Sequence, residues 1–172
     1  MKQIILRIAV PKLPPKNSPL VIYPTESSYA LGCRYNDSAA IRRIMRLKGR
    51  SDNRFTLIAN SLTQIKQHFD ITSHMEQLLN QSVSVVVTDK FAVRISTNPV
   101  ARELAKQAGV PILATSLNVS GKPPLFDLRR LDKRFADIPR IDSGPLPQRP
   151  PSTIVECFRG GYVIHRAGAV KL

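Results

Sequence analysis

The sequence predicts an α/β fold: a single domain over residues 1–172, with a twisted mixed sheet and flanking helices. Short runs rich in β-branched residues alternate with amphipathic stretches, which is the pattern of strands interleaved with helices. Two pairs of runs are joined so closely that they predict hairpins, so antiparallel strands occur beside parallel ones. A chain of 172 residues is long enough for one well-buried domain and too short for two.

The first half of the chain is predicted to open with two strands around a proline-rich turn. The expected ranges are 3–9 and 19–24 for these strands, 11–19 for the turn, 36–48 for a helix and 54–59 for the next strand. A polar residue at 36–38 is expected to cap the helix. Ser61 is expected to cap a short helix, and Ser73 with Glu76 has capping-box spacing for another.

The second half is predicted to alternate in the same way and to close with a hairpin. The expected elements are strands at 82–88, 91–96 and 110–116, a tight connection at 88–90, a helix at 98–109, and hairpin strands at 152–158 and 161–168. Pro99 lies in the first turn of the helix, and Gly109 is expected to end it. Residues 121–151 are rich in Pro, Arg and Asp, which predicts a long surface segment around one short helix.

The net positive charge of the chain favours partners that are negatively charged. Lys and Arg total 26 against 12 Asp and Glu, a formal net charge of +14. Such a field attracts polyanions and small anionic substrates alike. Only Cys33 and Cys157 are present, which predicts a reducing, cytoplasmic setting without structural disulfides. No apolar run approaches the roughly 20 residues that span a bilayer, so no membrane partner is expected.

Several catalytic motifs are absent from the sequence. There is no Gly-x-Gly-x-x-Gly fingerprint, and Gly121-Lys122 lacks the earlier glycine of a P-loop. No Gly-x-Ser-x-Gly elbow occurs, and His68, His74 and His165 are scattered without the spacing of a metal site. Nucleophilic and metal-centred catalysis therefore have no evident carrier, and no protein-bound metal is expected.

Hydroxyl side chains, together with one amide and one cation, collect where three of the predicted strands end or begin. The groups are Thr25, Ser27, Ser28 and Tyr29 after the strand at 19–24, Thr115, Ser116, Asn118 and Ser120 after the strand at 110–116, and Ser152, Thr153 and Arg166 on the closing hairpin. Because α/β sheets place ligands at strand ends, these groups together predict one mixed pocket of hydroxyls and cations. Taken alone, the first group is better explained by ordinary turn chemistry, the second equally well, and the third is unremarkable.

The basic run "RIMRLKGRSDNRF" divides into two parts. Its first part is interpreted as a solvated helix face made by Arg42, Arg43 and Arg46. Gly49 breaks the helix between Lys48 and Arg50. In an extended segment residues two apart point to the same side, so Lys48 and Arg50 are predicted to form a two-pronged cationic clamp suited to phosphates.

The stretches "YPTESSYALG", "KGR", "SLNVSG", "PSTIVE" and "HRAG", in this order over nearly the whole chain, resemble the YrdC/TsaC family of threonylcarbamoyl-AMP synthases. The resemblance implies a YrdC-like domain with a large, positively charged cavity. It also implies a reaction that joins L-threonine, bicarbonate and ATP, with Mg²⁺ accompanying the ATP, into threonylcarbamoyl-AMP and pyrophosphate. The adenylate then serves the threonylcarbamoyladenosine modification of tRNA.

The same resemblance assigns roles to individual residues. Lys48 and Arg50 are implied to be the catalytic cations on the nucleotide phosphates. The remaining nucleotide-binding residues are Arg54, Ser84, Ser116, Asn118 and Arg166. The residues implied to bind L-threonine are Thr25, Arg94 and Ser152.

The chain also departs from the synthase pattern, which leaves two alternatives open. Ser51 replaces the usual Pro, the Trp-Pro-Gly-Pro stretch is missing, and the connection at 88–90 is short. These features resemble the YciO branch, so one alternative is a YciO-like nucleotide- and RNA-binding protein with weak or no synthase activity. The other is a non-catalytic RNA-binding module, which the 6% aromatic content disfavours. Candidate partners therefore include tRNA or double-stranded RNA and downstream tRNA-modification proteins.

Overall fold

The computed structural model describes residues 19–172, and its elements follow the predicted order with one addition, β2. The strands are β1 (Val21–Pro24), β2 (Tyr29–Gly32), β3 (Phe55–Ala59), β4 (Ser84–Val86), β5 (Phe91–Ile95), β6 (Ile112–Ser116), β7 (Ile154–Phe158) and β8 (Gly161–Arg166). The helices are α1 (Ser38–Lys48), α2 (Leu62–Lys66), α3 (Ser73–Leu79) and α4 (Pro99–Ala108), with 3-10 helices η1 (Leu128–Arg130) and η2 (Lys133–Phe135). The strand expected at 3–9 and nearly all of the turn expected at 11–19 lie outside the described residues.

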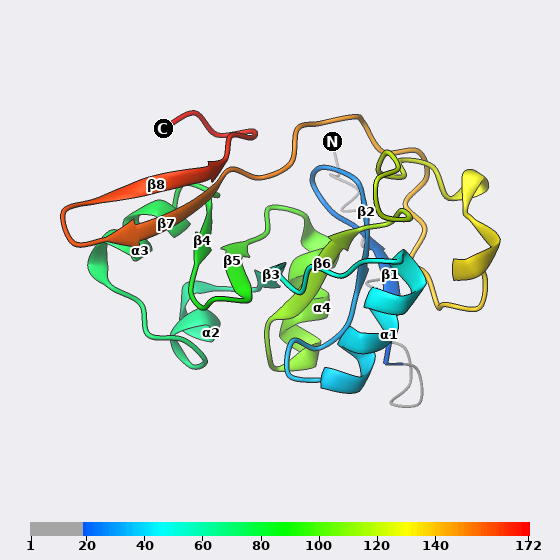
Figure 1. Cartoon of the computed structure of the whole chain (residues 1–172), viewed down its shortest axis with the longest axis horizontal. Helices are drawn as coiled ribbons and strands as arrows, with labels where there is room; N and C mark the ends of the chain where they lie inside the picture. Colours follow the sequence, from blue (N-terminus) through cyan, green and yellow to red (C-terminus); the bar gives the residue numbers. More distant parts are fainter. Residues whose placement is uncertain (1–18) are drawn as a thin grey trace, which may run out of the picture.

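The eight strands form one mixed sheet in the order β1-β2-β6-β3-β5-β4-β7-β8. The pairs β3–β5 and β4–β7 are parallel, and the other neighbours are antiparallel. Both predicted hairpins are present, as β4–β5 and β7–β8. Figure 1 shows the β7–β8 hairpin at one end of the molecule and α1 toward the other. The predicted mixed α/β sheet is confirmed; the single-domain prediction for the whole of 1–172 stays a prediction.

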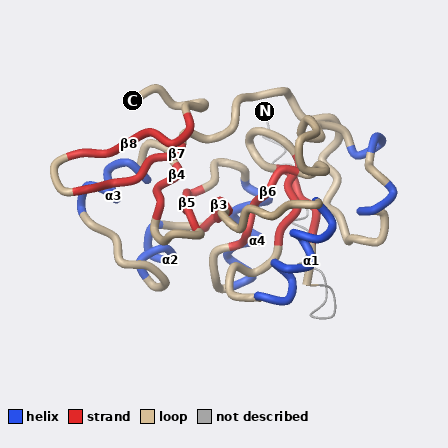
Figure 2. Tube along the Cα trace, in the orientation of Figure 1, coloured by secondary structure: helices blue, strands red, loops and turns tan. Residues whose placement is uncertain are grey.

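Alternation along the strands gives the sheet two apolar faces. On β3, Leu57 belongs to one buried cluster and Ile58 to another, because successive side chains point to opposite faces. Helix α4 packs on the Ile58 side and contacts β1, β3 and β6. Ala40 and Ile44 of α1 join the Leu57 cluster. Figure 2 shows the strands crossing the middle of the molecule with helices around them, so the sheet lies between helices.

The missed strand β2 is short and fully buried, and its last residue cannot carry a side chain. A Cβ on Gly32 would lie 2.1 Å from the carbonyl oxygen of Leu113 and 2.7 Å from the ring of Tyr23. The Tyr23 hydroxyl donates a hydrogen bond of 2.8 Å to that same carbonyl. Burial is the main cause that raises the pKa of Tyr23 far above its ordinary value. Gly32 therefore lets β1 and β6 pack closely around β2.

Helix α1 agrees with the prediction at both ends. Asp37 caps it by accepting a hydrogen bond of 2.9 Å from the backbone N–H of Ala40. Gly49 ends it in the left-handed conformation, with φ of 61°. The predicted solvated face is confirmed by the exposed side chains of Arg42, Arg43 and Arg46. Within residues 19–172, no helix combines the length and the apolar composition that crossing a bilayer requires.

Two local predictions were wrong. The N-cap of α3 is Thr72 rather than Ser73, because the Thr72 backbone is extended and its hydroxyl accepts the hydrogen bond from the N–H of Met75. The segment 121–151 holds two 3-10 helices and is not confined to the surface. It packs into the core through Leu128, Phe135, Ile138 and Ile141, which are spaced among its charged residues.

Candidate functional site

A cavity of about 1080 Å³ opens on the sheet face that carries α4. Thr56 pairs with Ala92 on β5 and Ala114 on β6, and it lies two residues from Ile58, so these side chains share the α4 face. Ala30 on β2 lines the cavity beside them. Small side chains on four neighbouring strands therefore leave a hollow where α4 does not cover the sheet.

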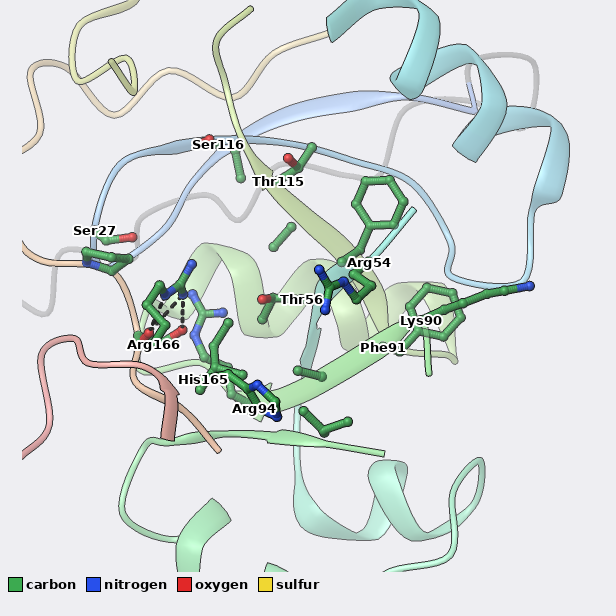
Figure 3. A pocket seen from close by; sticks show the side chains of 18 of the residues that line it. Ser27, Arg54, Thr56, Lys90, Phe91, Arg94, Thr115, Ser116, His165 and Arg166 are labelled. Atoms are coloured by element: carbon green, nitrogen blue, oxygen red, sulfur yellow. Dashed lines mark hydrogen bonds between the residues drawn. The ribbon is translucent and has the colours of Figure 1, made fainter. Parts of the chain in front are cut away.

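Charged and hydroxyl side chains surround this base. Figure 3 shows Arg54, Arg94 and Arg166 coming from different elements, with Ser116 on another side of the same space. Most of the predicted site residues line this one cavity. They are Thr25, Arg50, Arg54, Arg94, Ser116, Ser152 and Arg166. The predicted convergence of strand-end hydroxyls and cations is thus present.

Arg94 is the most deeply buried cation of the cavity wall, with 5% of its surface exposed. Its Nη2 lies 3.2 Å from Oε2 of Glu26 in an ion pair, and the Ser96 hydroxyl donates to the same oxygen at 3.0 Å. Within residues 19–172, the Nε–H of Arg94 is a buried donor without a hydrogen-bond partner. Leaving such a donor unsatisfied costs about 1–3 kcal/mol.

Arg166 is fixed beside Arg94 by the segment that precedes β7. Its Nη2 donates to the carbonyl oxygen of Ser152 at 2.8 Å and to the Ser152 hydroxyl at 3.1 Å. Burial, and then the charge of Arg94, lower the pKa of Arg166. The Ser152 hydroxyl also shares a hydrogen bond of 2.8 Å with the hydroxyl of Ser84. Ser84 is fully buried and is not among the residues that line the cavity, so it lies behind Ser152.

Gly168 sets the position of this segment. A Cβ on Gly168 would lie 2.2 Å from the carbonyl oxygen of Pro151 and 2.6 Å from the backbone nitrogen of Thr153. The Thr153 hydroxyl accepts a hydrogen bond of 3.1 Å from the Gly168 N–H. Gly168, two residues after Arg166, therefore allows the close backbone packing that holds Ser152 at the cavity.

Lys48 lies in a second, smaller cavity of about 370 Å³, which also includes Arg50, Ser116 and Asn118. Its ammonium donates to the carbonyl oxygen of Ser116, and to the backbone oxygen and Oδ1 of Asn118 at 2.8 Å each. Burial and, secondarily, the charge of Arg50 lower the pKa of Lys48 to about 8. The Ser116 hydroxyl donates to Asn118 Oδ1 at 2.7 Å, so these polar groups form one connected network.

The extended clamp predicted for Lys48 and Arg50 was wrong in its geometry. Lys48 is still helical and Gly49 is left-handed, so the segment between the two cations turns instead of running straight. Arg50 nevertheless lines both cavities. Its guanidinium lies 4.7 Å from the centre of the Phe55 ring, and its Nη2 is 3.0 Å from a carboxylate oxygen of Asp52.

Asp52 and Thr25 hold the turns that carry these groups. The Arg54 backbone N–H, and then the Arg50 side chain, hold the pKa of Asp52 below its ordinary value. The Thr25 hydroxyl donates to the carbonyl oxygen of Ser28 at 2.7 Å, which is the turn chemistry expected of a strand end. Thr25 thus lines the cavity while it orders the β1–β2 turn.

The sequence patterns missed three acidic or basic groups at the site. Glu26, the partner of Arg94, directly follows Thr25, in a stretch whose predicted site residues were all hydroxyl-bearing. Glu156 and His165 both line the large cavity, and His165 was interpreted only as a strand residue. The signal that could have found Glu26 and His165 was a carboxylate or imidazole directly beside a predicted site residue.

The chain matches known proteins over most of its length. The model of the Sua5/YciO/YrdC family, whose description reads "Telomere recombination", matches residues 16–168. A threonylcarbamoyl-AMP synthase of Klebsiella pneumoniae subsp. pneumoniae is 27% identical over 167 residues, which cover 84% of this chain and 88% of that protein.

Solved structures of similar fold agree with this match. P. abyssi Sua5, crystallised in complex with L-threonine, is 28% identical and superposes with a TM-score of 0.77 over 87% of this chain and 50% of that one. The chain therefore spans about half the length of that Sua5. E. coli YciO superposes with a TM-score of 0.75 over 90% of this chain and 85% of that one, and at 24% identity this likeness concerns the fold.

Proposed function

Because the chain belongs to the Sua5/YciO/YrdC family, we propose that it is a threonylcarbamoyl-AMP synthase, a nucleotidyltransferase that forms L-threonylcarbamoyladenylate and pyrophosphate from L-threonine, bicarbonate and ATP. The observation that carries the proposal is one large cavity whose wall holds a buried, partly unsatisfied Arg94 and, from other elements, Arg50 and Arg166. Such a cavity suits two anionic substrates at once.

L-Threonine is assigned to the Arg94 part of the cavity. A guanidinium can donate to both oxygens of a carboxylate, and within residues 19–172 the Nε–H of Arg94 has no hydrogen-bond partner. Ser152 and Thr25 line the cavity nearby as hydroxyl partners. The complex of P. abyssi Sua5 with L-threonine supports the assignment of this substrate.

ATP is assigned to the part bounded by Arg50 and the Lys48 network. Within residues 19–172, the hydrogen-bond partners of Lys48 are neutral oxygens, so its charge stays available to phosphates. The remaining residues assigned to the nucleotide are Arg54, Ser116, Asn118 and Arg166. Ser84, which hydrogen-bonds Ser152, is assigned instead to the support of the threonine side. Mg²⁺ would arrive with ATP as part of the substrate, and adenylyl transfer would depend on positioning and charge neutralisation.

The cellular setting follows from this assignment. A cytoplasmic location suits both the substrates and the two free cysteines, of which Cys33 is buried with its pKa raised to about 12 by that burial. tRNA and downstream tRNA-modification proteins are the proposed consumers of the adenylate.

The test is a pyrophosphate-release assay with purified protein, Mg²⁺, ATP, bicarbonate and L-threonine. Release is expected to require threonine, and L-serine offered instead is the matched control for amino-acid recognition. ATP consumption indifferent to threonine contradicts the proposal. Tight ATP binding with no threonine-dependent turnover favours the YciO-like alternative.

A further inference from the structure

The β7–β8 hairpin carries an irregularity at the cavity. Val155 pairs with Ile164 and Ile154 with Arg166, so His165 is an extra residue on β8. In a regular strand, His165 and Arg166 would point to opposite faces of the sheet. The bulge re-aims the side chains, and both residues line the large cavity.

His165 is paired with a carboxylate that lines the same cavity. Its Nε2 lies 2.6 Å from Oε2 of Glu156 on the neighbouring strand. When Nε2 carries the proton of that hydrogen bond, Nδ1 is left as a proton acceptor. A carboxylate on the far nitrogen orients an imidazole and stabilises the imidazolium that forms when it takes a proton.

The pair stands next to the proposed threonine position. Arg166, the following residue, binds both oxygens of Ser152, and its pKa responds to the charge of Arg94. The other charged residues that line this cavity are Arg50, Asp52, Arg54, Asp89, Lys90 and Arg149. His165 thus borders the part of the cavity where the threonine carboxylate is placed.

The proposed reaction needs a base at this place. Threonine enters with an α-ammonium group, which has no lone pair, and α-amino groups ordinarily have a pKa of about 8. The nitrogen must lose a proton before it can form the N–C bond of the carbamate. None of the cations assigned to the substrates can accept that proton while charged.

We propose that His165 is the catalytic base that deprotonates the threonine α-ammonium, with Glu156 as its positioning residue; the proposal rests on the synthase function above. The imidazole takes one proton and becomes imidazolium, and threonine becomes the free amine. The amine lone pair then forms the N–C bond with the carbon of bicarbonate. One C–O bond breaks, and the displaced oxygen leaves as water with the second amine proton. The imidazolium returns its proton to solvent.

The test compares His165→Gln with a matched control, His74→Gln. His74 lies on α3 with its ring near Tyr162 and is not among the residues that line either cavity. At pH 7, His165→Gln is expected to lower kcat for threonine-dependent pyrophosphate release about 100-fold, the ordinary scale of general-base catalysis. The threonine KM is expected to change less than threefold, and the control is expected to match the wild type.

Two further readouts separate a base from a structural role. The loss in His165→Gln is expected to shrink as pH rises from 7 to 9.5, because solvent then deprotonates the ammonium unaided. Imidazole added to His165→Ala is expected to restore part of the activity, and the same imidazole is expected to do nothing for Arg166→Ala. Glu156→Gln should show a smaller loss with the same pH trend.

The outcomes distinguish the two proposals. If the wild type shows no threonine-dependent release, the synthase function itself fails. If the wild type is active and His165→Gln equals it, or if a loss persists at pH 9.5 without imidazole rescue, the base assignment is overturned. Should His165→Gln not fold, the pH trend of Glu156→Gln decides.

Discussion

Arg94 and Lys48 are both almost completely buried cations, at 5% and 3% exposed, and the protein holds them in opposite ways. Arg94 has a carboxylate partner, Glu26, which in turn accepts a hydrogen bond from Ser96. In the described part of the chain, Lys48 has no carboxylate among its hydrogen-bond partners, which are neutral oxygens of Ser116 and Asn118. One positive charge is therefore compensated within the fold and the other is not.

This difference in charge compensation suggests which kind of ligand each cation binds. The ion pair with Glu26 fixes the Arg94 guanidinium in one orientation, which suits directed contact with a small carboxylate. An uncompensated buried ammonium is costly, and the lowered pKa of Lys48, about 8, reflects that cost. An incoming phosphate would offset it, so the Lys48 end is suited to a highly charged ligand.

The largest effect is expected from Arg94→Ala. The variant removes the threonine anchor and leaves the Glu26 carboxylate without its partner. Truncating one member of a buried charge pair costs about 2–5 kcal/mol. Threonine-dependent pyrophosphate release should fall about 100-fold or more, with a threonine KM too high to saturate. Glu26→Gln is the control: it leaves Arg94 in place and should raise the KM less. Equal activity in Arg94→Ala and the wild type would remove Arg94 from the site.

Lys48→Met is expected to have the next largest effect, on ATP. It deletes the charge and removes the Lys48 donor from three oxygens, two of which keep another donor, the Ser116 hydroxyl for Asn118 Oδ1 and the Asn118 N–H for the Ser116 carbonyl. An oxygen left without any donor costs about 1–3 kcal/mol. Calorimetry should show ATP affinity reduced about 10- to 100-fold, together with a lower Tm. Threonine affinity measured alone should stay near the wild-type value. A loss of both affinities would mean that the Lys48 cavity and the Arg94 part of the large cavity are not independent.

A pH titration tests whether ATP binding depends on the positive charge of Lys48. Burial lowers the pKa of Lys48 from its ordinary value of 10.5 to about 8, so the free protein loses this charge as pH rises above about 8. Binding of ATP must then restore a proton, so ATP affinity should fall about tenfold between pH 7.5 and 9.5. Proton uptake is measurable by calorimetry in two buffers of different ionisation enthalpy. Lys48→Arg, which stays charged, should lose the dependence; a constant wild-type affinity would contradict the idea.

Much of the fold could be predicted because local patterns determine it. Asp37 and Gly49 bound α1 as expected, and the β4–β5 and β7–β8 hairpins follow from short connections between β-branched runs. β2 was missed because its four residues are buried on both faces and show no alternation. Ser73 was chosen over Thr72 because spacing alone cannot show which backbone is extended.

The sequence predicted which residues lie at the site better than it predicted how they are arranged. Strand-end hydroxyls and cations do converge, because strand ends at one sheet edge meet in space. The contacts of Lys48 could not be foreseen, because they depend on a loop about 70 residues away along the chain. Glu26 as the partner of Arg94 is likewise a contact between the β1–β2 turn and the distant strand β5. Such pairings belong to tertiary packing and leave no mark in local sequence.

Gly168→Ala should have a moderate effect confined to the threonine end. Its Cβ would collide with the backbone of Pro151 and Thr153, so the segment that carries Ser152 must shift. The threonine KM is expected to rise about fivefold to tenfold, since a displacement near 1 Å can cost that much or more. ATP affinity should be unchanged by calorimetry. Gly160→Ala, in the β7–β8 turn with open space around it, is the control for strain alone.

The smallest effect is expected from the double change Arg42→Ala and Arg43→Ala on the exposed face of α1. These side chains are exposed and have no assigned role in either cavity, so stability should change by no more than about 0.5 kcal/mol. Threonine-dependent pyrophosphate release should equal the wild type. Binding of tRNA, measured at several salt concentrations, separates the functions: a pocket enzyme keeps its synthesis while RNA affinity and its salt dependence decrease. If RNA binding disappears and the wild type shows no synthase activity, the protein is better described as an RNA-binding module. Arg94 and Lys48 then do not bind L-threonine and ATP.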